Sequence, residues 1–149
     1  MKTILAAVEF RKDEAPILNC TAEMARAFQA PVYLLHVEPP EPDFVGYHPG
    51  PQYIRDHVAQ QAQADHELLH VYRDQLRQQG IEGESLLIQG PTAQKVVEEA
   101  RRLEAACIIV GSHGHGVLHD LFWGSVSEGI IRKAPCPVLV VPTSAEIGG

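Results

Sequence analysis

Three glycines and a serine near the end of the chain have the spacing needed to hold a phosphate group. Gly111 and Gly114 follow a short apolar run, and nine residues separate Gly114 from Gly124 and Ser125. Glycine lets the backbone approach an anion closely, and the free N–H groups of a helix start favour negative charge. By chance this spacing arises in fewer than about one chain in a hundred of this length. The pattern therefore predicts a phosphate site.

The expected donors are backbone N–H groups of Gly114–Gly116 and Ser125–Ser127, where Ser125 and Glu128 also form a capping-box pattern. A purely structural role for Ser125 as a helix cap is the alternative. No Gly-Lys-Ser or Gly-Lys-Thr follows the glycines, so this is not a Walker loop and no lysine reaches the phosphates. We expect a divalent ion, Mg²⁺ or Mn²⁺, held mainly by phosphate oxygens, to neutralise them.

Predicted strands, seen as short apolar runs, alternate with predicted helices, seen as apolar residues at helical spacing, and these elements must position the glycine loop. The pattern predicts an α/β fold, a single-domain, doubly wound, five-stranded parallel sheet with helices on both faces. In such sheets, ligands bind beyond the carboxyl ends of the strands where strand order reverses, so Glu9 and Gly111 should flank the site. The predicted strands are 3–8, 32–37, 85–89, 107–110 and 137–141, and the predicted helices begin near Pro16, Ile54, Val96 and Ser125.

The glycine pattern, the first strand Ile4–Val8, the run Leu34–Val37 and the final Ala134–Val141 resemble the universal stress protein A family over nearly the whole chain. The resemblance implies a Rossmann-like fold of the adenine nucleotide α-hydrolase type, often dimeric, and, for members with the glycine pattern, ATP binding. It also implies where the nucleotide and its divalent ion lie. The residues expected at the nucleotide are Ala7, Val8, Glu9, Val37, Val110, Gly111, His113, Gly114, His115, Gly116, Val117, Gly124, Ser125, Val126 and Ser127.

The chain departs from the family at one position of the adenine site. Family members usually have Asp where this chain has Glu9, commonly followed within two positions by Ser or Gly, but here Phe10 and Arg11 follow. The longer carboxylate could accept a hydrogen bond from the adenine amino group, or it could crowd the pocket. Phosphate binding is thus more firmly predicted than adenine specificity.

These observations predict an ATP-binding sensor or regulator in the stress response, with at most slow hydrolysis, because no positioned general base, catalytic lysine or arginine finger is evident. A true enzyme on the same fold, a nucleotide hydrolase or nucleotidyl transferase, is one alternative. Another is a dimeric regulatory module that binds AMP or another adenine derivative. We expect a homodimer paired through Pro137–Val141, a short apolar strand at the sheet edge, and an unidentified regulated protein as a further partner.

Composition narrows the remaining classes. The 149 residues suit one universal stress protein domain over 1–149, with a Pro-rich loop at 39–51 and a tail at 142–149, and a net charge of −7 argues against nucleic-acid or anionic-membrane partners. Three well-separated cysteines predict buried, reduced thiols. No apolar run approaches a membrane span, so we expect a cytoplasmic protein without membrane insertion. The Pro-rich loop is either a lid, a docking loop or a plain connection.

Eight histidines raise the question of a metal site. His66 with His70, and His115 with His119, are spaced to share a helix face, but no acidic or cysteine ligand that would complete a tetrahedral site is evident. We therefore expect no transition metal held by protein ligands. His36 lies inside an apolar strand and is interpreted as a satisfied, partly buried side chain.

Overall fold

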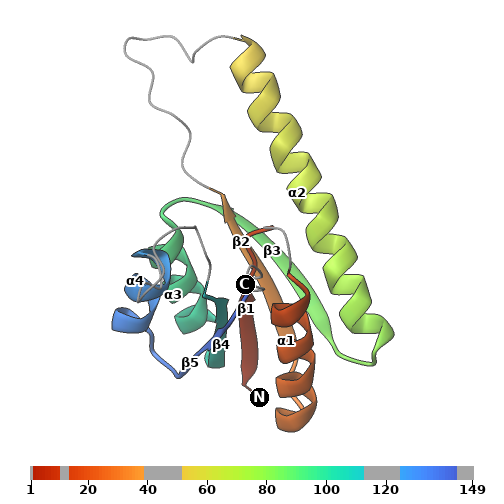
Figure 1. The fold of residues 1–149 in the computed structure, drawn as a ribbon, viewed down its shortest axis with the longest axis vertical. Coiled ribbons are helices and arrows are strands. Elements are labelled where there is room, and N and C mark those ends of the chain that lie inside the picture. The colour runs from red at the N-terminus through yellow and green to blue at the C-terminus, as the bar shows by residue number, and fades with distance from the viewer. Residues whose placement is uncertain (1, 11–13, 39–51, 113–124, 144–149) are drawn as a thin grey trace, which may run out of the picture.

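A computed structural model describes residues 2–10, 14–38, 52–112 and 125–143, and strands alternate with helices throughout (Figure 1). This order confirms the predicted α/β class, and each predicted element is present within a few residues. The elements are β1 Thr3–Ala7, α1 Ala15–Phe28, β2 Val32–Glu38, α2 Gln52–Gln78, β3 Gly83–Gln89, α3 Thr92–Arg102, β4 Ala105–Gly111, α4 Ser125–Lys133 and β5 Val138–Val141.

The five strands form one parallel sheet in the order β3-β2-β1-β4-β5. Strand β1 is central, and the chain builds β2 and β3 on one side of it before crossing to β4 and β5 on the other. Strand order therefore reverses between β1 and β4. The carboxyl ends of these two strands, at Ala7 and Gly111, flank the crevice where such sheets bind ligands.

Two helices cover each face of the sheet, α1 and α2 on one side and α3 and α4 on the other (Figure 1). Each face has its own apolar cluster because successive residues of a strand point to opposite sides. Ile4 and Leu34 pack with α1 and α2, whereas Leu5 and Leu35 pack with α3 and α4. All four of these side chains are fully buried, as expected for parallel strands covered on both faces.

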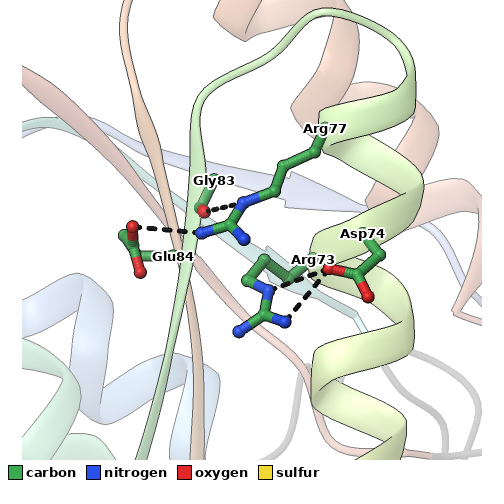
Figure 2. Close-up of polar contacts among 5 residues, drawn as sticks. All are labelled: Arg73, Asp74, Arg77, Gly83 and Glu84. Carbon is green, nitrogen blue, oxygen red and sulfur yellow. Dashed lines mark hydrogen bonds and ion pairs between the residues drawn. The ribbon is translucent and has the colours of Figure 1, made fainter.

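Helix α2 is anchored to the sheet mainly through its second half. Leu69 and Leu76 are its buried residues, and its first half extends beyond the sheet (Figure 1). Figure 2 shows Arg77 reaching across to β3, where its Nε donates to the Gly83 carbonyl at 2.8 Å and its Nη2 pairs with Glu84 at 3.1 Å. The helix ends before Gly80, whose φ of 83° is readily adopted by glycine.

Composition predicts buried, reduced thiols, and burial is confirmed for one of the three: Cys107 is buried, whereas Cys20 and Cys136 are half-buried. Cys20, Cys107 and Cys136 are free, and burial raises the pKa of all three thiols, so they stay protonated at neutral pH. Within the described ranges, no helix is both long and apolar enough to cross a membrane.

Candidate functional site

A cavity of about 220 Å³ lies at the carboxyl ends of β1, β2 and β4, on the face covered by α3 and α4. It occupies the point where strand order reverses, as the sequence predicts for a ligand site. Its lining residues are Ala7, Val8, Glu9, Leu35, His36, Val37, Thr92, Val96, Val110, Gly111, Val126, Ser127 and Ile130.

Eight of the predicted site residues border this cavity: Ala7, Val8, Glu9, Val37, Val110, Gly111, Val126 and Ser127. The predictions for His113, Gly114, His115, Gly116, Val117 and Gly124 lie outside the described residues, as does the side chain of Ser125. The remaining lining residues were not predicted. Val96 and Ile130 have the helical spacing of core residues, and nothing in the sequence separates a core contact from a cavity wall.

The cavity is apolar along most of its wall, with Glu9, Thr92 and Ser127 as polar groups beside His36. Ser127 is buried, and its Oγ donates a long hydrogen bond of 3.4 Å to the Gly111 carbonyl, which ties the first turn of α4 to the end of β4. Helix α4 thus begins at the cavity, which its Val126 and Ser127 border. Glu128, expected in a capping box with Ser125, accepts a hydrogen bond from Arg132 at 2.7 Å, and the capping box itself stays a prediction.

Among the residues that depart from the family pattern, Glu9 and Phe10 lie on opposite faces of the sheet. Glu9 borders the cavity, and its backbone N–H donates to the Glu14 carboxylate at 2.9 Å. Phe10 has a φ of 56°, a left-handed conformation uncommon outside glycine and asparagine. Its ring packs on the α1 and α2 face, 4.3 Å from the His36 ring between centroids. The bulky Phe10 therefore does not fill the cavity.

His36 is held in place by β1, as its interpretation as a satisfied, partly buried side chain predicts. Its Nδ1 lies 2.8 Å from the Val8 carbonyl oxygen, and its side chain is only 11% exposed. The other ring nitrogen, Nε2, faces the Asp65 carboxylate on α2 at 3.5 Å. No sequence pattern pairs a strand histidine with a helix residue 29 positions away, so this contact was not predicted.

The predicted histidine pairs contribute no complete metal site in the described part of the chain. His66 and His70 lie on α2 with ring centroids 4.1 Å apart, while His115 and His119 lie outside the described residues. In the described ranges, one group of three side chains could hold a metal ion. It consists of His36, Glu38 and Asp65.

A second cavity, of about 330 Å³, lies between α1 and α2 and is lined by residues such as Glu14, Asn19 and Gln75. It is larger than the first, but it borders neither the strand ends at β1 and β4 nor the start of α4. The smaller cavity is therefore the one that borders the strand ends named in the prediction.

A parallel sheet with a cavity at its switch point, bordered by a glycine strand end and a helix start, defines a Rossmann-like α/β domain. A model of the universal stress protein family matches residues 1–142, and the chain belongs to this family. A universal stress protein of Thermus aquaticus is 30% identical over 142 residues, which are 94% of this chain and 98% of the relative.

Solved structures of the same family share the fold. A universal stress protein from Archaeoglobus fulgidus is 29% identical with a TM-score of 0.72, and the alignment covers 95% of this chain and 98% of that one. The structure of the universal stress protein from the same organism in complex with dAMP is 26% identical with a TM-score of 0.64, and it covers the same shares. That relative therefore binds an adenine nucleotide.

Proposed function

We propose that this chain binds an adenine nucleotide, ATP together with Mg²⁺ or Mn²⁺, in the cavity at the ends of β1, β2 and β4. The observation that carries the proposal is the position of this cavity, which eight independently predicted site residues border at the switch point. The dAMP complex of the Archaeoglobus fulgidus relative supports an adenine ligand. Bound nucleotide would make the chain a sensor or regulator acting on a partner protein.

The size and polarity of the cavity suit the base. Its volume of about 220 Å³ is below the roughly 300–1,000 Å³ of pockets that enclose whole small molecules. Apolar walls from Val37, Val96 and Val126 would cover the faces of a purine, and the Glu9 carboxylate could accept from its amino group. Ribose and phosphates would extend past Gly111 toward the glycine loop.

The charge of the site explains the need for a divalent ion. No Lys or Arg lines the described wall of the cavity, and Glu9 adds negative charge. Backbone amides at the start of α4 and in the loop would leave most of the triphosphate charge uncompensated. The absence of a cation on this wall also agrees with at most slow hydrolysis, because phosphoryl transfer depends on neutralising the charge that develops.

Calorimetry with ATP tests the proposal directly. We expect ATP binding that weakens at least tenfold in EDTA, and loss of binding in Gly114→Val, because the added side chain would occupy the space of a phosphate. His57→Val, on the exposed start of α2, is the control and should bind normally. Unchanged ATP affinity in a folded Gly114→Val protein would place the site elsewhere, and equal affinity with and without EDTA would remove the ion.

A second candidate function is a module selective for a nucleoside monophosphate. The dAMP complex of the Archaeoglobus fulgidus relative supports it. In that case AMP would bind more tightly than ATP, and EDTA would have no effect. An enzyme on the same fold, a hydrolase or nucleotidyl transferase, would instead show multiple turnover of ATP that Gly114→Val abolishes. Nucleotide identified in the purified protein by mass spectrometry would distinguish the two ligands.

A further inference from the structure

Three side chains with metal-ligand chemistry meet where α2 passes the carboxyl end of β2. His36 and Glu38 lie two residues apart on β2 and so point to the same face of the sheet, and Asp65 comes from α2. Their ligand atoms, one per residue, all lie within 4.8 Å of one another. The side chains of His36 and Asp65 are 11% and 13% exposed, so the cluster is largely shielded from solvent.

The hydrogen bond from His36 to β1 defines what its second nitrogen can do. The Val8 carbonyl oxygen can only accept, so His36 Nδ1 carries the proton in this 2.8 Å contact. In the neutral ring, the lone pair of Nε2 then points toward the Asp65 carboxylate, 3.5 Å away. Two acceptors that face each other at this distance need a cation between them, either a second proton on the ring or a metal ion.

The distance favours an ion over a direct hydrogen bond. A charge-assisted N–H to carboxylate bond is about 2.7–2.9 Å long, whereas two ligands about 2.1 Å from a tetrahedral zinc lie about 3.4 Å apart. Each of the two ligands is also oriented by a hydrogen bond from behind. Val8 holds His36, and Gln61 Nε2 donates to Asp65 Oδ1 at 2.9 Å, which leaves Oδ2 directed at the histidine. Metal ligands are commonly supported in this way.

Glu38 would supply a third ligand, and one of its oxygen atoms gives an independent reason to expect a cation here. Its Oε1 is sealed from solvent and has no hydrogen-bond partner among the described residues. A buried acceptor oxygen next to a second carboxylate is costly, and a divalent cation would satisfy both groups.

We propose that His36, Glu38 and Asp65 bind a divalent transition-metal ion of the zinc class. Three protein ligands, here one imidazole and two carboxylates, would leave the fourth position of a tetrahedral zinc ion open for water. Imidazole suits zinc, iron, cobalt and nickel, whereas Mg²⁺ and Ca²⁺ prefer oxygen ligands alone. Small rotations of the carboxyl groups would bring the three ligand atoms to zinc distances.

This ion is distinct from the one expected on the nucleotide phosphates. His36 packs on the face of the sheet covered by α1 and α2, beside Phe10, whereas Val37 on the same strand points to the cavity side. The proposed metal therefore needs no nucleotide. It would, however, hold the end of β2 and the Val8 carbonyl in place, and His36 and Val8 themselves border the cavity.

Zinc titration of the nucleotide-free full chain tests the site. We expect one Zn²⁺ per chain by calorimetry or by competition with a chromophoric chelator, and visible ligand-field bands when Co²⁺ replaces zinc. Asp65→Asn, which keeps the shape of the side chain, should lower zinc affinity at least about tenfold, and Glu38→Gln should do the same. The control is the double variant His66→Gln, His70→Gln, which removes the neighbouring histidine pair of α2 and should leave affinity unchanged.

Several results would overturn the proposal. The absence of stoichiometric zinc binding at micromolar concentration would do so, as would equal affinity in folded Asp65→Asn and Glu38→Gln proteins. Loss of binding in the His66, His70 double variant would assign the metal to that pair instead. Circular dichroism of each variant without metal establishes that the fold is retained. Because no nucleotide is present, the outcome is independent of ATP binding.

Discussion

At the residue scale, Gly111 has two roles. It ends β4 beside the cavity, and its neighbours lie so close that an added Cβ would force a shift. A Cβ placed there would lie 2.9 Å from Ile17 Cδ1 and 2.9 Å from Thr143 Cγ2, which is closer than carbon atoms approach without a shift. Ile17 is buried in the core on the α1 face. Gly111 therefore packs closely against α1 and the segment after β5, and an added Cβ would displace the ends of two neighbouring side chains.

We expect Gly111→Ala to lower the free energy of unfolding by about 1–3 kcal/mol, the usual cost of overpacking. Gly83→Ala is the matched control. That strand glycine would place its Cβ 3.6 Å or more from its neighbours, an ordinary contact, and should change stability by less than about 1 kcal/mol. Urea denaturation followed by circular dichroism measures both. Equal effects for the two variants would show that the end of β4 adjusts freely.

At the scale of elements, the attachment of α2 to β3 depends on one arginine more than on its neighbour. Arg77 donates to the backbone carbonyl of Gly83, whereas the guanidinium of Arg73 pairs with Asp74 on its own helix (Figure 2). Asp74 is 53% exposed, so its contact with Arg73 competes with water. Only Arg77 connects two elements in this group.

We expect Arg77→Met to destabilise the fold by about 1–2 kcal/mol, because a partly buried carbonyl loses its charged donor. Arg73→Met is the control and should cost less than about 1 kcal/mol. Methionine keeps the aliphatic stem in both variants, so lost packing does not confuse the comparison. Thermal and urea unfolding report the difference. An Arg73 effect as large as the Arg77 effect would refute this account of the attachment.

The elements themselves were largely predictable, because strand and helix periods differ and glycine and proline mark their ends. Runs such as Ile4–Val8 have no polar residue, and Gly80 marks the end of the long helix. Bounds shifted by a few residues where no such marker exists. Strand β3, for instance, begins at Gly83 rather than Ser85, because pairing with β2 overrides the low strand preference of glycine.

The candidate site was predictable only in part. Glu9 and Gly111 follow from the rule that ligands bind at strand ends, Ala7 and Val37 were implied by the family resemblance, and the cavity borders all four. Thr92 and Ile130 could not be assigned, since helix packing decides which of their contacts face a cavity. The cluster of His36, Glu38 and Asp65 was missed for a similar reason. His36 and Asp65 are 29 positions apart in the sequence, and only the packing of α2 on β2 brings them together.

At the scale of the whole molecule, β5 leaves one apolar edge of the sheet open. It pairs only with β4 among the described strands, and it ends the sheet as predicted. Val138, Leu139 and Val140 are half-buried, so each retains exposed apolar surface. An exposed edge of this kind exposes unpaired N–H and C=O groups as well as side chains, and is commonly covered by another chain.

We expect two copies of the chain to pair through β5. A two-fold axis would set the two β5 strands antiparallel, so that each covers the same residues of the other. Val140→Lys should convert the dimer to a monomer, because a lysine in this short strand would face its own copy across the axis and both charges would lose water. Light scattering at micromolar concentration measures the mass.

Leu86→Lys, at a half-buried position on the opposite edge strand β3, is the matched control and should leave the dimer intact. A monomeric wild type would show that β5 is covered within the chain, and a dimeric Val140→Lys variant would place the interface on another surface.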